Sequence, residues 1–141
     1  MNEIEAMQMT KDFEGLMLKP YICPAGKLSI GYGRNLADNG ITKEEAEFLF
    51  LHDYNNAIRN LKALCVSKGI DYEHLHKDVF YALTDMMFNM GYDRLSTFKK
   101  LFSELKKGSY EGVAREMKNS KWYTQVGDRS KKLVEIVKKS S

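Results

Sequence analysis

Apolar residues recur at three- and four-residue steps along most of the chain, which is the spacing of one face of an α-helix. The longest such pattern runs from Ala46 to Cys65, and Thr42 with Glu45 just before it forms a capping-box pattern. We therefore predict one long helix over about residues 43–65. The same spacing predicts further helices around 78–90, 97–107, 110–118 and 128–138, with Gly91 and Gly108 as C-caps.

The pattern differs in the first third of the chain. Apolar positions from Ile4 to Met17 predict an opening helix, which Pro20 should stop because proline disfavours helix in the residue before it. Residues 24–26 are turn formers, and residues 28–33 then alternate apolar with small or polar side chains. This alternation predicts a short β-hairpin, with Glu14 near the end of the preceding helix.

Together these elements predict a mostly α-helical α+β protein. With 141 residues, of which 43% are apolar, the chain can bury the core of a single domain. We expect a small hairpin lobe over about 13–42, a connecting helix over 43–65, and a helical lobe over 66–141 that packs with the N-terminal helix. A cleft is expected between the lobes.

Composition narrows the function classes. The formal charge is +3, from 22 basic and 19 acidic residues, which is too small to argue for nucleic acid. No apolar run approaches the roughly 20 residues that cross a bilayer, and the first residues lack a signal-peptide pattern. We expect a soluble protein without membrane insertion that stays in the cytoplasm until it is released. Cys23 and Cys65 are predicted to be free thiols, and neither a metal site nor a cofactor is expected.

The candidate chemistry lies in residues 13–33, where Glu14 precedes the hairpin and Cys23 and Ser29 lie on it. This stretch resembles the glutamate-and-hairpin signature of phage-type lysozymes (endolysins of glycoside hydrolase family 24), a motif of the form Glu-x8-Asp-x5-Thr-Ile-Gly. Cysteine and serine stand here at the aspartate and threonine positions. The resemblance continues in order through residues 40–47, 88–91 and 120–123.

The resemblance implies the lysozyme-like fold and hydrolysis of the β-1,4 bond between N-acetylmuramic acid and N-acetylglucosamine in peptidoglycan. Glu14 is the expected general acid of this reaction. Cys23 admits three roles: it could help Ser29 hold an attacking water, attack the anomeric carbon as a thiolate, or be a passive replacement. The last role leaves an alternative function, a catalytically weakened relative that binds wall glycans.

Other residues take supporting roles by the same resemblance. Four are candidate sugar contacts, because saccharides bind to aromatic faces and fixed hydrogen-bonding groups: Tyr32, Asn35, Phe88 and Asn89. Arg129 matches the family arginine that pairs with the glutamate. Arg34 stands where the family often has histidine, and Asp53 matches the acid that pairs with it, so we expect an ion pair between Arg34 and Asp53.

The resemblance also implies where the protein works. The expected substrate is the bacterial cell wall in the periplasm, reached from the host cytoplasm through a membrane lesion made by a second protein, a holin. The protein is expected to act as a monomer.

Overall fold

The computed structural model describes residues 1–141 and has the expected mostly helical α+β fold. It divides into two compact units, Met1–Leu49 and Phe50–Ser141, each described here by itself. The predicted division into lobes, with the N-terminal helix packed on the helical lobe, stays a prediction.

The first helix, α1 (Glu3–Glu14), is shorter than the sequence pattern predicts. It begins at Asn2, which forms a capping box with Glu5, and ends at Gly15. Gly15 takes a φ of +74°, and its N–H donates to the Lys11 carbonyl oxygen at 2.8 Å. Because glycine adopts positive φ at little steric cost, the helix stops several residues before Pro20. Glu14 is therefore the last helical residue, as expected.

The predicted hairpin is confirmed, and a third strand extends it. Strands β1 (Met17–Ile22), β2 (Leu28–Gly31) and β3 (Arg34–Asn35) form an antiparallel sheet in that order. The predicted turn is closed by a hydrogen bond from the Gly26 N–H to the Cys23 carbonyl oxygen at 2.8 Å. In β2 the small polar residue is the one buried, since Ser29 is 2% exposed and Leu28 is 42% exposed. A short helix, α2 (Leu36–Asn39), follows β3.

The long predicted helix is confirmed as α3 (Lys43–Ser67). Its capping box is also present: the Thr42 N–H donates to Glu45 Oε1 at 2.8 Å, and the Glu45 N–H donates to Thr42 Oγ1 at 3.1 Å. The residues of α3 that enter a core all lie in its second half, at Ala57, Leu61, Leu64 and Cys65.

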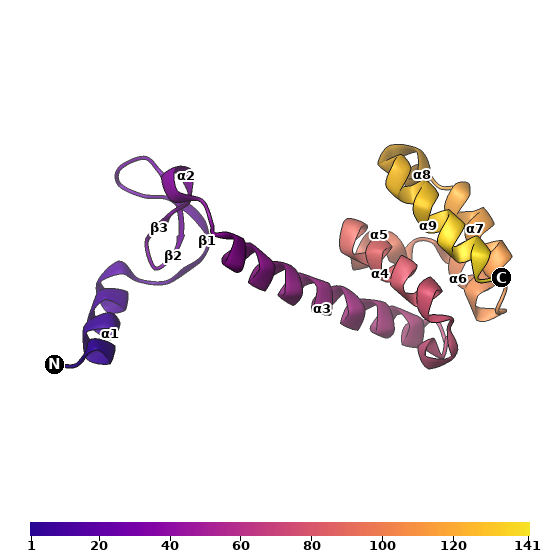
Figure 1. Ribbon diagram of the computed structural model, residues 1–141, viewed down its shortest axis with the longest axis horizontal. Coiled ribbons are helices and arrows are strands. Elements are labelled where there is room, and N and C mark those ends of the chain that lie inside the picture. The colour runs from indigo at the N-terminus through magenta and orange to yellow at the C-terminus, as the bar shows by residue number, and fades with distance from the viewer. The chain divides into compact units, whose positions relative to one another are not determined.

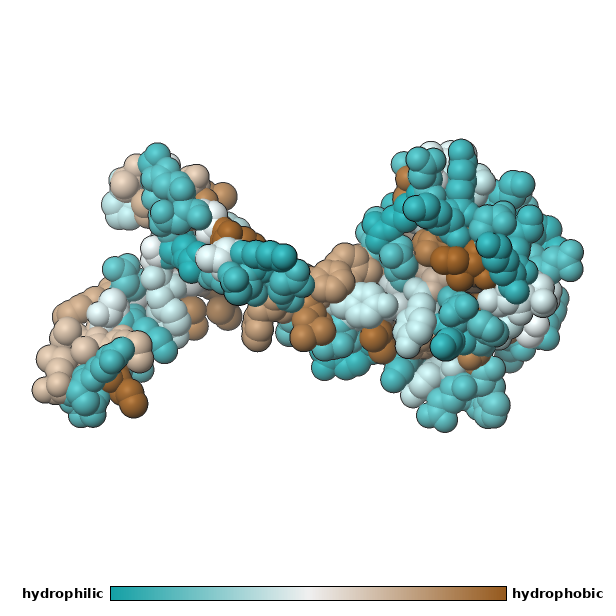
Figure 2. Space-filling view, viewed as in Figure 1, coloured by the Kyte–Doolittle hydropathy of each residue, from teal (hydrophilic) through white to brown (hydrophobic).

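The second unit is built from helices around one apolar core (Figure 1). After a 3-10 turn, η1 (Tyr72–His74), come α4 (Lys77–Met90), α5 (Tyr92–Ser96), α6 (Lys99–Lys106), α7 (Tyr110–Lys118), α8 (Lys121–Val126) and α9 (Asp128–Lys139). Helix α7 packs against α6 and α9, and α9 also packs against α4. Trp122 and Phe102 are among the largest side chains fully enclosed. Hydrophilic side chains dominate the face of this unit drawn in Figure 2.

Most helix predictions for this unit hold, and the exceptions have local causes. The helix predicted over 97–107 starts two residues later, because Thr97 caps α5 and Phe98 precedes α6 with a non-helical ψ of 60°. The short helices α5 and α8 were not predicted, because five or six residues are too few to show a helical period. Cys23 and Cys65 are free thiols, as predicted. No helix combines the length and the apolar character needed to cross a membrane.

Candidate active site

Cys23 and Ser29 lie together at the closed end of the hairpin. Strand pairing places Ile22 opposite Leu28 and Tyr21 opposite Ser29, and the Cys23 N–H donates to the Lys27 carbonyl oxygen at 2.9 Å. The Ser29 hydroxyl donates to the same carbonyl oxygen at 3.1 Å. The two predicted residues are thus neighbours.

This environment makes Cys23 a better acid than an ordinary cysteine. Hydrogen bonding to the backbone at Lys27 is the largest cause that lowers the pKa of the Cys23 thiol, and Ala25 and the Ser29 hydroxyl add to it, while desolvation opposes them. Cys65 behaves in the opposite way, because burial raises the pKa of its thiol to about 11. Of the two cysteines, Cys23 is therefore the one whose thiolate is favoured.

Glu14 lies against the turn between β2 and β3. Its carboxyl group occupies the space beside the Cα of Gly33 where a side chain would be: a Cβ at that position would lie 3.0 Å from the carboxyl carbon of Glu14. One turn earlier in α1, the ammonium group of Lys11 lies 5.3 Å from the ring centroid of Tyr32. The end of α1 and this turn are therefore in contact, so that the three predicted catalytic residues belong to one unit.

Within the first unit Arg34 pairs with Glu45, and the expected ion pair with Asp53 of the second unit stays a prediction. Arg34 donates from Nη1 to Glu45 Oε1 at 3.0 Å and from Nη2 to Glu45 Oε2 at 2.6 Å, and Nη1 also donates to the Gly40 carbonyl oxygen at 3.1 Å. Side-chain hydrogen bonding to Arg34 is the main cause that lowers the pKa of Glu45 to about 2. The capping box holds the Glu45 carboxylate close to the sheet, where Arg34 reaches it.

Two of the proposed sugar contacts lie in this first unit. Tyr32 is 47% exposed and has the Lys11 ammonium over its ring. Asn35 is the N-cap of α2: its Oδ1 accepts from the Asp38 N–H and its Nδ2 donates to Asp38 Oδ2, both at 3.0 Å. Because both ends of its amide are engaged, Asn35 has a structural role that the sequence analysis missed.

Phe88 lies in an aromatic cluster of the second unit. Its ring centroid is 5.6 Å from that of Phe50 and 6.3 Å from that of Tyr54. Phe88 also lines a cavity of about 320 Å³, together with Asp53 and Asn56. An aromatic ring beside a carboxylate and an amide is a combination that suits a carbohydrate.

The amide of Asn89 is oriented by Trp122. The buried indole donates from Nε1 to Asn89 Oδ1 at 3.1 Å. Since the carbonyl end of the amide is engaged, the Nδ2 group is the end left to donate to a ligand. Trp122, expected to be mainly a packing residue, therefore also orients a candidate sugar contact.

Arg129 forms an ion pair within the second unit. Its Nε donates to Asp85 Oδ1 at 2.7 Å, and both side chains are partly exposed. The pairing with Glu14 implied by the family stays a prediction. No sequence pattern singled out Asp85, because its partner lies 44 positions along the chain.

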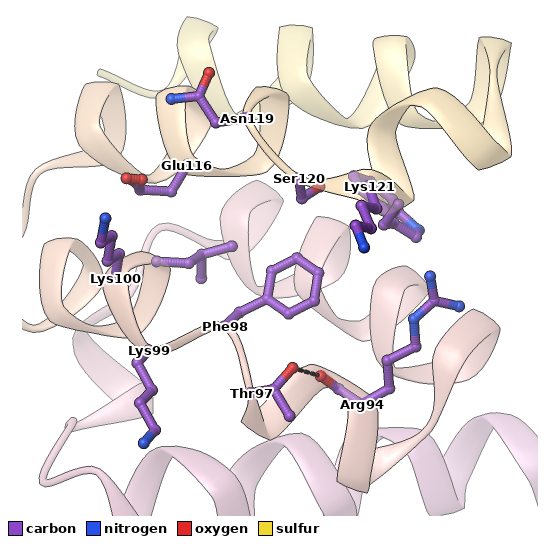
Figure 3. A pocket seen from close by; sticks show the side chains of 11 residues that line it. Arg94, Thr97, Phe98, Lys99, Lys100, Glu116, Asn119, Ser120 and Lys121 are labelled. Atoms are coloured by element: carbon purple, nitrogen blue, oxygen red, sulfur yellow. Dashed lines mark hydrogen bonds between the residues drawn. The ribbon is translucent and has the colours of Figure 1, made fainter.

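The largest cavity of the second unit has a basic lining. It measures about 570 Å³ and is lined by Arg94, Lys99, Lys100 and Lys121, with Glu116 as its one carboxylate. The ring of Phe98 points into its middle, with Lys121 and Arg94 on one side and Lys100 and Glu116 on the other (Figure 3). None of these five charged residues forms an ion pair. The cavity therefore offers unpaired positive charge.

Comparison with known proteins shows which family the chain resembles. A model of the family "Phage lysozyme" matches residues 11–139. Two proteins of Dictyostelium discoideum, "Probable T4-type lysozyme 2" and "Probable T4-type lysozyme 1", are 32% and 30% identical over 96 and 97 residues, which are 68% and 69% of this chain and 56% of each protein. The "Endolysin" of Acyrthosiphon pisum secondary endosymbiont phage 1 is 32% identical over 122 residues, 84% of this chain and 77% of that protein.

The chain spans about half the length of the two Dictyostelium proteins. The family model, by contrast, covers nearly all of this chain, from residue 11 to residue 139. The chain belongs to the phage lysozyme family.

Proposed function

We propose that this protein is an endolysin-type muramidase that hydrolyses the β-1,4 bond between N-acetylmuramic acid and N-acetylglucosamine in peptidoglycan. The observation that supports this most is the contact of the Glu14 carboxyl group with the turn of the same sheet that carries Cys23 and Ser29. An acid and a second reactive group held on one small scaffold are what hydrolysis of a glycosidic bond requires.

Glu14 acts as the general acid in this proposal. It donates its proton to the glycosidic oxygen as the bond from that oxygen to the anomeric carbon breaks, and the sugar ring develops oxocarbenium character. The leaving sugar departs with a new hydroxyl group. Water then supplies the oxygen at the anomeric carbon, and the proton lost from that water must be accepted.

Cys23 takes the place of the second carboxylate. Its lowered thiol pKa favours a thiolate, which can orient the water and accept its proton. Ser29 is almost completely buried, so its proposed role is to brace Cys23 through the shared Lys27 carbonyl oxygen rather than to face the substrate. Direct attack by the thiolate on the anomeric carbon is the alternative route, and it would retain the anomeric configuration.

The second unit supplies two of the proposed substrate contacts, and Tyr32 of the first unit is a third. Phe88 offers an aromatic face, and Asn89 offers the Nδ2 donor that Trp122 leaves free, which suits the carbonyl oxygen of an acetamido group. Peptidoglycan also carries carboxylates on its lactyl and peptide substituents, and the basic cavity beside Lys100 and Lys121 suits them by charge. Arg129 is the proposed partner of Glu14, as the family resemblance implies.

The biological setting follows from the same proposal. The protein would act as a monomer on the wall, without a cofactor, after release from the host cytoplasm through a lesion made by a second protein. One relative, the "Endolysin" of Acyrthosiphon pisum secondary endosymbiont phage 1, is a phage protein, which supports this setting.

The test is the release of reducing ends from purified peptidoglycan, with analysis of the anomer formed. Glu14→Gln should abolish release, whereas Glu47→Gln, a change of an exposed glutamate on α3, should leave it unchanged. Cys23→Ala should reduce release strongly, and Cys23→Asp should restore it. An inverted product supports attack by water, and a retained product supports attack by sulfur.

The same assay judges the competing function, a weakened relative that binds wall glycans. If the folded parent releases nothing, still sediments with insoluble peptidoglycan, and gains activity only as Cys23→Asp, the muramidase proposal is wrong and the binding function takes its place.

A further inference from the structure

Gly33 stands out among the glycines of the first unit by what lies beside it. Its φ is +74°, and a Cβ built on it would overlap Glu14 Oε2 and lie 3.0 Å from the carboxyl carbon and 3.6 Å from Cγ of Glu14. The overlap with Oε2 is one that a real Cβ essentially never shows, and the approach to the carboxyl carbon is unusually tight. The carboxyl group of Glu14 can therefore hold its place only because residue 33 has no side chain.

Gly31 shows that this contact is separate from backbone conformation. Its φ is +73°, practically the same as that of Gly33, yet nothing lies within 4 Å of a Cβ built on it. Both positions favour glycine for the same conformational reason. Only at Gly33 would a side chain also meet Glu14.

Two features of the first unit set the position of the Glu14 carboxyl group. The backbone of Glu14 is fixed at the last residue of α1, where Gly15 ends the helix. The neighbouring contact of Lys11 with the ring of Tyr32 holds the same helix end over the same turn. The end of α1 thus sets where the Glu14 side chain starts, and the absence of a side chain at Gly33 sets how close its carboxyl group comes to the turn.

We propose that Gly33 is a positioning residue for the general acid. By leaving space for the Glu14 carboxyl group, it determines where the proton is delivered relative to Cys23 on the neighbouring hairpin. The carboxyl is the free end of a flexible side chain, so a methyl group at residue 33 would displace it rather than unfold the protein. This inference rests on the proposed role of Glu14.

The experiment compares Gly33→Ala with Gly31→Ala in the peptidoglycan assay. Both changes place alanine at positive φ, so both should lower the thermal midpoint by a similar amount. Only Gly33→Ala should also lower kcat, by about 100-fold, because a displacement of about 1 Å in a catalytic group can cost that much. KM should stay within about twofold in both variants, since neither glycine is a proposed sugar contact.

A shorter acidic side chain at residue 14 should relieve the effect of Gly33→Ala. In the Glu14→Asp background the carboxyl is withdrawn by one methylene group, so adding Gly33→Ala should cost much less than it does in the parent. If Gly33→Ala does not fold, Gly33→Asn and Gly31→Asn repeat the comparison, because asparagine tolerates positive φ better than alanine. Equal losses of kcat at the two glycines would overturn the inference.

A readout that needs no activity separates this inference from the proposed function. The carboxyl-carbon NMR signal of Glu14, assigned by its loss in Glu14→Gln, should move in Gly33→Ala and stay in place in Gly31→Ala. An inactive parent with this pattern means that the proposed function fails while the contact stands. An unmoved signal in Gly33→Ala overturns the inference whether or not the parent is active.

Discussion

Replacing Ser29 with alanine should weaken the fold by a modest amount and raise the pKa of the Cys23 thiol. The Ser29 hydroxyl is buried and donates to the Lys27 carbonyl oxygen at 3.1 Å, and its hydrogen bonding is one of the smaller causes that lower the pKa of the Cys23 thiol. Alanine removes the hydroxyl without adding volume. Both effects should therefore come from the lost hydrogen bonding and not from repacking.

The expected loss of stability is that of one neutral hydrogen bond. A typical intramolecular hydrogen bond contributes about 0.5–1.5 kcal/mol net, and the Lys27 carbonyl oxygen keeps its bond from the Cys23 N–H after the change. We therefore expect Ser29→Ala to lower the free energy of unfolding by about 1 kcal/mol. Urea denaturation followed by far-ultraviolet circular dichroism measures this difference.

The expected change in the thiol is partial. Hydrogen bonding to the backbone at Lys27, the largest cause of the lowered pKa, is retained, and only the contribution of the Ser29 hydroxyl is lost. The pH dependence of iodoacetamide alkylation at Cys23 should therefore move to higher pH. Peptide mass analysis separates this signal from Cys65, whose thiol pKa is raised to about 11 by burial.

The sign of the linked stability follows from the lowered pKa. A thiol whose pKa is lower in the folded state contributes stability at pH above its ordinary pKa, and that stability is lost as the pH falls through the folded-state pKa. The difference between the parent and Ser29→Ala should thus widen toward alkaline pH.

Ser130→Ala is the matched control. Ser130 is also a fully buried serine, and its hydroxyl lies 2.7 Å from the carbonyl oxygens of Tyr123 and Gly127. It should lose at least as much stability and leave the alkylation of Cys23 unchanged. An unchanged alkylation profile in Ser29→Ala, or an equal shift in Ser130→Ala, would refute the assigned hydrogen bonding.

Two further predictions concern charge. Arg34→Met should return the pKa of Glu45 from about 2 toward its ordinary value. The stability that the variant loses should therefore be greatest above about pH 4.5 and vanish as the pH falls through about 2. Thermal unfolding of the parent and the variant from pH 2 to pH 7 measures this loss. Lys100→Glu should raise KM for wall fragments that carry peptide carboxylates and leave kcat unchanged, whereas Lys131→Glu, which makes the same charge change outside the cavity, should alter neither constant.

Interactions between near neighbours in the chain could be predicted from the sequence. The capping box of Thr42 and Glu45 joins residues three positions apart, and the Cys23 to Gly26 turn is equally local. The helices α3, α4, α7 and α9 repeat their apolar spacing over enough residues to be recognised. The resemblance of one short motif was enough to identify Glu14, Cys23 and Ser29 as candidates.

The sequence by itself therefore determined the longer elements, because helix periods, caps and turns depend on interactions within a few positions, and its motifs indicated the family and the candidate reactive residues. Only the tertiary structure decided the partners: Arg34 with Glu45 across 11 positions, Arg129 with Asp85 across 44, and the Glu14 carboxyl group beside Gly33. Several acids could have paired with either arginine by charge alone. Which of them did so depended on the distances that folding produced.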